Sequence, residues 1–120
     1  MLGLTILVVE EEYLVAAEIE ATLLAEGASK VMIARDLEDV GPQTPAFDLA
    51  IIEAKLGAPD SIAFAASLSE AGVAVVVTSA DRAVSSLFTG AVPLEKPFDD
   101  NALLAACEAA RRMSRPLAQV

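Results

Sequence analysis

The sequence predicts an α/β domain built on a doubly wound, five-stranded parallel sheet, with helices on both faces and a reduced fourth helix. Two observations predict this class. Short runs of β-branched and other apolar residues alternate with Ala-rich stretches of helical length. These runs are apolar almost throughout, which is typical of strands that are buried on both faces of a parallel sheet.

Five strands are expected, and the residues at or just beyond their carboxyl ends carry polar side chains. Their expected ranges are Thr5–Val9, Lys30–Ala34, Asp48–Glu53, Val73–Thr78 and Ala91–Glu95. The last strand is the weakest because Pro93 has no backbone N–H to donate to a neighbouring strand.

Four helices are expected between and after these strands, of which the one at Asp36–Val40 is weak because Gly41 and Pro42 end it. Val15, Ile19 and Leu23 recur every four residues in the first helix, which places them on one apolar face. Gly27 provides the left-handed residue that often follows a helix, and Asp60, in a loop with Gly57 and Pro59, is expected to cap the third helix. The expected ranges are Glu11–Glu26, Asp36–Val40, Ser61–Ala71 and Asp99–Met113.

The length of 120 residues suits a single domain, 1–120, with a core of about residues 4–113 and a short tail at 114–120. The lone Cys107 cannot form a disulfide within the chain and fits a reducing compartment. The first apolar run is far too short to span a membrane and has no basic leader before it. We therefore expect a cytoplasmic protein.

Charge and composition exclude several functions. The net charge is −10, and the main basic cluster is the small group Arg111, Arg112 and Arg115, so direct nucleic-acid binding is not expected. The chain has no His, and Cys107 lies within a helix among mostly apolar neighbours. Because no nucleophile–base pair is available, an unrelated small enzyme is disfavoured.

Polar side chains gather where the strands end, at the edge where open parallel sheets bind ligands. Each has an ordinary explanation alone, since acids at a helix start are favoured by the helix dipole. Their convergence at four strand ends is what indicates a site. The residues are Glu10, Glu11 and Glu12 after the first strand, Glu53 and Lys55 at the third, Thr78 at the fourth and Lys96 at the fifth.

Four motifs in this order resemble the receiver domain of two-component signalling, as in CheY-like response regulators. ILVVEEE is similar to the first strand and acidic pair, which places the pair at Glu10 and Glu11. FDLAIIEAKLG resembles the phosphoacceptor strand, with Glu53 at the acceptor position. VAVVVTSAD carries the hydroxyl at Thr78, and PLEKPF matches the lysine–proline signature at Lys96.

The resemblance extends from about Leu4 to Met113 and implies a flavodoxin-like fold of the receiver type. It implies Mg²⁺ held by the acidic pair, the acceptor Glu53 and the backbone carbonyl of Lys55. It implies phosphoryl transfer from a histidine kinase or phosphotransfer protein, assisted by the hydroxyl and the lysine. The resemblance further implies a homodimer and a cis Lys96–Pro97 bond. Direct binding to nucleic acid or to a membrane is not expected.

The sequence departs from the family where the acceptor aspartate is replaced by Glu53. The extra carbon–carbon bond adds about 1.5 Å of reach. Because a misplacement of about 1 Å can cost about a hundredfold in rate, phosphoryl transfer is expected to be slow or absent, and Mg²⁺ binding is expected to be weakened.

Neighbouring carboxylates at this edge also repel one another, which Mg²⁺, Lys96, Lys55 or protonation of one acid must relieve. One hypothesis is that Glu53 reaches Lys96 or Thr78 and imitates the phosphorylated state. The other is that Glu53 only preserves packing and charge in an inactive site.

The second departure concerns the segment before the fifth strand. Pro93 stands where the family resemblance implies an aromatic switch residue. Asp81–Phe88, barely two turns, is the helical stretch that remains for a fourth helix. Leu87 and Phe88 are expected to be buried in the core, with an exposed apolar patch as the alternative.

Two functions follow from these observations. The chain is expected to be a stand-alone receiver in a phosphorelay, with the atypical acceptor Glu53. The alternative is a pseudo-receiver that docks another protein without being phosphorylated.

Overall fold

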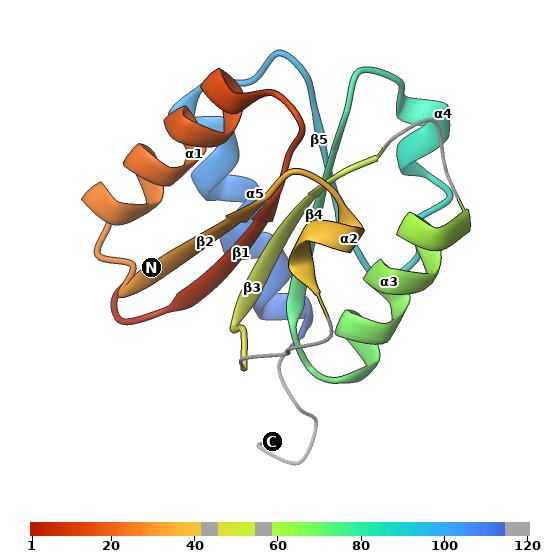
Figure 1. Ribbon diagram of the computed structural model, residues 1–120, viewed down its shortest axis with the longest axis horizontal. Helices are drawn as coiled ribbons and strands as arrows, with labels where there is room; N and C mark the ends of the chain where they lie inside the picture. The colour runs from red at the N-terminus through yellow and green to blue at the C-terminus, as the bar shows by residue number, and fades with distance from the viewer. Residues whose placement is uncertain (42–45, 55–58, 115–120) are drawn as a thin grey trace.

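A computed structural model describes residues 1–41, 46–54 and 59–114, and it shows one five-stranded sheet between two layers of helices (Figure 1). Every strand pairs in parallel with its neighbours, in the order β2-β1-β3-β4-β5. The strands are β1 Thr5–Val9, β2 Lys30–Ala34, β3 Leu49–Glu53, β4 Ala74–Ser79 and β5 Val92–Glu95. The predicted fold class is confirmed.

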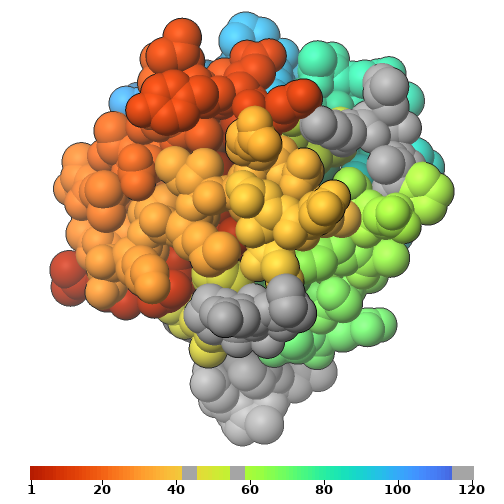
Figure 2. Space-filling model, viewed as in Figure 1, coloured from red at the N-terminus to blue at the C-terminus, as the bar shows by residue number. Residues whose placement is uncertain are grey.

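Helices cover both faces of this sheet. They are α1 Tyr13–Ala25, α2 Leu37–Val40, α3 Pro59–Glu70, α4 Arg82–Ser85 and α5 Asp100–Met113. α1 and α5 contribute to one apolar cluster, and α2 and α3 contribute to the other. In the space-filling view, the β2–α2 segment lies between α1 and α3 on the face that is shown (Figure 2).

Side-chain alternation along the strands divides the core into these two clusters. Ile6 and Val8 of β1 pack on the side of α1 and α5, whereas Leu7 and Val9 pack on the opposite side. All four are buried, so β1 is a strand with two apolar faces. This is why its sequence is an apolar run without alternation.

The end of α1 agrees with the sequence analysis. Gly27 has φ of 100°, a left-handed conformation that L side chains rarely adopt. The N–H of Ala28 donates to the carbonyl of Leu23 at 3.1 Å, which satisfies one of the last helical carbonyls.

The predicted start of α3 was wrong. α3 begins at Pro59, so Asp60 lies in its first turn and does not cap it. The physical reason is Pro59, whose fixed φ and missing N–H suit the first position of a helix. Gly57, expected in the preceding loop, and the tail beyond Ser114 lie outside the described residues.

The reduced fourth helix is confirmed, since α4 has only four residues. Asp81 caps it by accepting a 2.8 Å hydrogen bond from the N–H of Ala83. Phe88 is 4% exposed, as predicted, but Leu87 is 52% exposed, so the expected burial of Leu87 was wrong. Just beyond this short helix the two adjacent side chains diverge, and only Phe88 joins the cluster formed with α3.

No helix in the described part of the chain is long and apolar enough to cross a membrane.

Candidate functional site

An ion-pair cluster formed by Glu10, Glu53 and Lys96 lies at the carboxyl edge of the sheet. Lys96 Nζ donates to Glu53 Oε2 at 2.7 Å and to Glu10 Oε1 at 2.9 Å. Glu10 follows β1, Glu53 ends β3 and Lys96 follows β5, so the lysine reaches across the end of β4. The three residues that the strand ends predicted therefore meet in space.

Backbone hydrogen bonds fix the positions from which these side chains extend. The Glu10 N–H donates to the carbonyl of Ala34 at 2.9 Å, which ties Glu10 to the end of β2. The Lys96 N–H donates to the carbonyl of Ser79 at 2.8 Å, which ties Lys96 to the end of β4. The Lys96–Pro97 peptide bond that follows is cis, as the family resemblance implied.

Glu10 is buried, with 2% of its surface exposed, and both of its carboxylate oxygens have partners. Oε1 accepts from Lys96, and Oε2 accepts from the N–H of Glu12 at 3.0 Å. The sequence analysis did not anticipate this role for Glu12. The contact could have been predicted from the position of Glu12 at the start of a helix. The first N–H groups of a helix have no intrahelical partner and can hold a carboxylate.

Glu53 is only half satisfied. Its Oε2 binds Lys96, whereas its Oε1 is buried and has no hydrogen-bond partner among the described residues. Two carboxylates share one ammonium group, so the cluster carries a net charge of about −1 if both acids are ionised. An additional hydrogen-bond donor or cation at Oε1 would complete it.

The surroundings of Lys96 act on its pKa in opposite directions. Partial burial of the ammonium lowers the pKa, but the hydrogen bonds to Glu53 and Glu10 and their negative charges outweigh that effect. The net result is a pKa above the ordinary lysine value, so Lys96 is a cation at neutral pH.

The other predicted site residues lie outside the ion-pair cluster or outside the described residues. Thr78 pairs with Glu53 in the β3–β4 register and is buried beside it. Glu11 is exposed just beyond Glu10, and Lys55, whose carbonyl was a predicted Mg²⁺ ligand, lies outside the described residues. Glu53 contacts Lys96, as one of the two hypotheses expected, whereas its imitation of the phosphorylated state stays a prediction.

The oxygen-rich site has the chemistry that Mg²⁺ prefers, but its arrangement does not fit a ready-made metal site. Within residues 1–41, 46–54 and 59–114, no group of three or more acidic, His or Cys side chains could hold a metal ion. The ammonium group of Lys96 already pairs with both Glu10 and Glu53, two of the acids predicted to hold the metal ion. Mg²⁺ binding stays a prediction.

The fold and this cluster can be compared with known proteins. The sequence matches no family model and no curated protein. Solved structures of response regulators do match. A response regulator from Thermotoga maritima is 21% identical, with 92% of this chain and 99% of that chain covered and a TM-score of 0.77.

Two further structures agree. An orphan response regulator of H. pylori is 23% identical, with 93% and 100% covered and a TM-score of 0.75. A response regulator receiver protein from Sinorhizobium medicae is 22% identical, with 94% and 98% covered and a TM-score of 0.74. The chain therefore has the CheY-like fold of a response-regulator receiver domain.

Proposed function

We propose that this chain is a receiver module of two-component signalling that acts by docking other proteins, without transfer of a phosphoryl group to Glu53. The observation that carries the proposal is the state of the Glu53 carboxylate. Oε2 is bound to Lys96 at 2.7 Å, and Oε1 is buried. Neither oxygen is presented as a free nucleophile.

Phosphoryl transfer needs an oxygen lone pair that is aligned with the phosphorus atom of the donor. Glu53 Oε1 is enclosed, and Oε2 would have to leave Lys96 before it could attack. The carboxylate already held on Lys96 gives the receiver fold one constant charge state. A module in one constant state can bind its partner, a histidine kinase or a phosphotransfer protein, without a phosphorylation signal.

The second candidate is a phosphorelay receiver that accepts phosphate on Glu53. It is favoured by the presence of a carboxylate at the end of β3, with Thr78 beside it in the sheet and Lys96 in contact. In that function Glu10, Glu11 and Glu53 would supply acid ligands for Mg²⁺. Lys96 would stabilise charge on the transferring phosphoryl group.

Intact-protein mass spectrometry separates the two candidates. The protein, Glu53→Asp and Glu53→Gln are incubated with Mg²⁺ and acetyl phosphate, and then with a phosphorylated histidine kinase. We expect no phosphate on the natural protein, while Glu53→Asp gains one. A hydroxylamine-labile phosphate on the natural protein that is missing from Glu53→Gln would overturn the docking proposal and establish the phosphorelay function.

Binding measurements test docking directly. Affinity for a histidine kinase or phosphotransfer protein should be the same with and without the phosphodonor, because the Glu53 carboxylate does not change. A phosphodonor-dependent change in affinity would contradict this. Sedimentation in the same buffer tests the predicted homodimer.

A further inference from the structure

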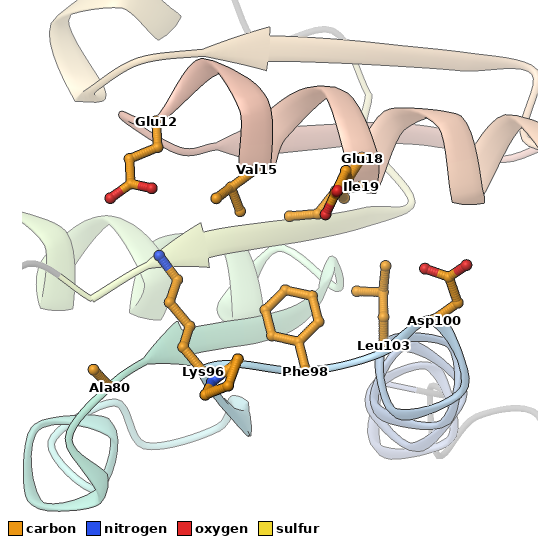
Figure 3. A pocket seen from close by; sticks show the side chains of 10 residues that line it. Glu12, Val15, Glu18, Ile19, Ala80, Lys96, Phe98, Asp100 and Leu103 are labelled. Atoms are coloured by element: carbon orange, nitrogen blue, oxygen red, sulfur yellow. The ribbon is translucent and has the colours of Figure 1, made fainter.

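A cleft of about 400 Å³ lies between α1 and the beginning of α5 (Figure 3). It adjoins the ion-pair cluster through Lys96, and half of its lining residues belong to α1 and α5. Its volume is in the range of pockets that bind small molecules.

The inner lining of the cleft is apolar. Val15 and Ile19 come from α1, Leu103 comes from α5, and Phe98 comes from the segment that joins β5 to α5. Phe98 is only partly buried against the core, and its ring stands between Lys96 and Leu103 in Figure 3. The cleft therefore offers an aromatic ring as well as aliphatic side chains to a ligand.

The outer lining is acidic. Glu12, Glu18 and Asp100 are exposed and line the cleft. Of the described residues that line it, Lys96 alone is basic, and its ammonium is held by Glu10 and Glu53. The negative charge of this rim is therefore not neutralised from within the cleft.

We propose that this cleft binds a small organic ammonium ion, that is, a primary amine carried on an apolar body. Carboxylates attract the cation, the ring of Phe98 adds a cation–π interaction, and Val15, Ile19 and Leu103 cover the apolar body. Glu18 and Asp100 lie together at the end of the cleft away from the Lys96 ammonium (Figure 3), so the ligand's ammonium is placed there. The proposal is independent of whether Glu53 accepts phosphate.

The charge and the volume of the cleft also disfavour other occupants, namely organic anions and partner proteins. An organic anion would meet the acidic rim, so it should bind more weakly than a neutral molecule of the same shape. The volume suits a ligand of small-molecule size, so the expected occupant is a free amine and not a partner protein.

Three probes of equal shape test the charge requirement. 4-Phenylbutylamine, 4-phenylbutan-1-ol and 4-phenylbutyrate are titrated into the full chain at low ionic strength, with amide shifts of Ile19 and Phe98 followed by NMR. The amine should bind about fivefold or more tightly than the alcohol, and the carboxylate should bind most weakly. Added salt should reduce the preference for the amine because it screens the carboxylates.

Variants locate the interaction. Glu18→Gln and Phe98→Leu should each lower the amine-to-alcohol affinity ratio by about two- to fivefold. Glu26→Gln, which changes an exposed acid at the C-terminal end of α1 and outside the cleft lining, should leave the ratio unchanged. Circular dichroism confirms that each variant is folded.

Four results would overturn the proposal. Three of them are equal affinity for amine and alcohol, equal effects of Glu18→Gln and Glu26→Gln, and amide shifts that fall outside the cleft. Binding of a lysine-rich peptide without binding of the free amine would also overturn it, because the cleft would then belong to a partner protein.

Discussion

Lys96 Nζ lies 2.7 Å from Glu53 Oε2, although the two residues are 43 positions apart in the chain. The same nitrogen lies 2.9 Å from Glu10 Oε1, so one cation serves two acids. Glu10 is almost fully buried and the other two side chains are about one fifth exposed, at 19% for Glu53 and 20% for Lys96. Lys96 is therefore the group on which the electrostatic balance of this edge depends.

Replacement of Lys96 by methionine should destabilise the fold. The substitution keeps most of the side-chain volume but leaves Glu10 and Glu53 without their shared cation. Loss of one partner from a fully buried pair costs about 3–5 kcal/mol, and partial exposure reduces this to about 1–3 kcal/mol here. Urea unfolding at pH 7 measures the difference.

The matched control is Arg112→Gln. Its ion pair with Glu108 is 3.6 Å long and exposed on α5, so its removal should change stability by less than about 0.5 kcal/mol. If Lys96→Met proves as mild as this control, the cluster does not stabilise the fold.

Alkaline pH should remove the contribution of Lys96. Its pKa is raised in the folded protein, so the stabilisation is complete below the unfolded lysine pKa of about 10.4. It is lost as the pH rises through the higher folded value. The free energy of unfolding should therefore fall above about pH 10, and the fall should be smaller in Lys96→Met.

This comparison belongs in a Cys107→Ala background, because the thiol changes stability in the same direction. Burial raises the pKa of Cys107 to about 12. Its own contribution is lost from the ordinary thiol pKa of about 8.5 upward. Parallel pH profiles for the protein with and without Lys96 would show that the raised lysine pKa does not matter for folding.

Cys107 itself should be unreactive in the folded protein. Its side chain is 0% exposed in the core cluster that α5 covers, and the raised pKa keeps it protonated at pH 8. Labelling with iodoacetamide should follow the rate of unfolding, and urea should accelerate it greatly. A labelling rate close to that of a free thiol under native conditions would show that α5 opens locally.

Much of the fold could be predicted from the sequence because its strands are short apolar runs. Every predicted strand lies within one residue of the observed bounds. The parallel order then brings strand ends to one edge, which is why Glu10, Glu53 and Lys96 could be placed together from the sequence alone. These inferences depend only on periodicity and chain order.

The finer contacts depend on packing, which a single sequence does not contain. The contact of Glu53 with Lys96 rather than Thr78 is a choice of side-chain rotamer. The cleft lies between α1 and the start of α5, and no pattern in the sequence around Phe98 predicts it. The predicted start of α3 was wrong because two adjacent residues can each begin a helix. Asp60 could cap it, but Pro59 occupies its first position.

The last prediction compares Asp99 and Asp60, two aspartates that the sequence places at the start of a helix. Asp99 Oδ1 accepts from the N–H of Ala102 at 2.8 Å and caps α5, whereas Asp60 lies within the first turn of α3. Asp99→Ala should therefore lower the free energy of unfolding by about 1 kcal/mol, because the helix loses its cap. Asp60→Ala loses only a favourable interaction with the helix dipole, about 0.3–0.5 kcal/mol. Urea unfolding of both variants at pH 7 measures the pair, and an equal loss would show that Asp60 caps α3 after all.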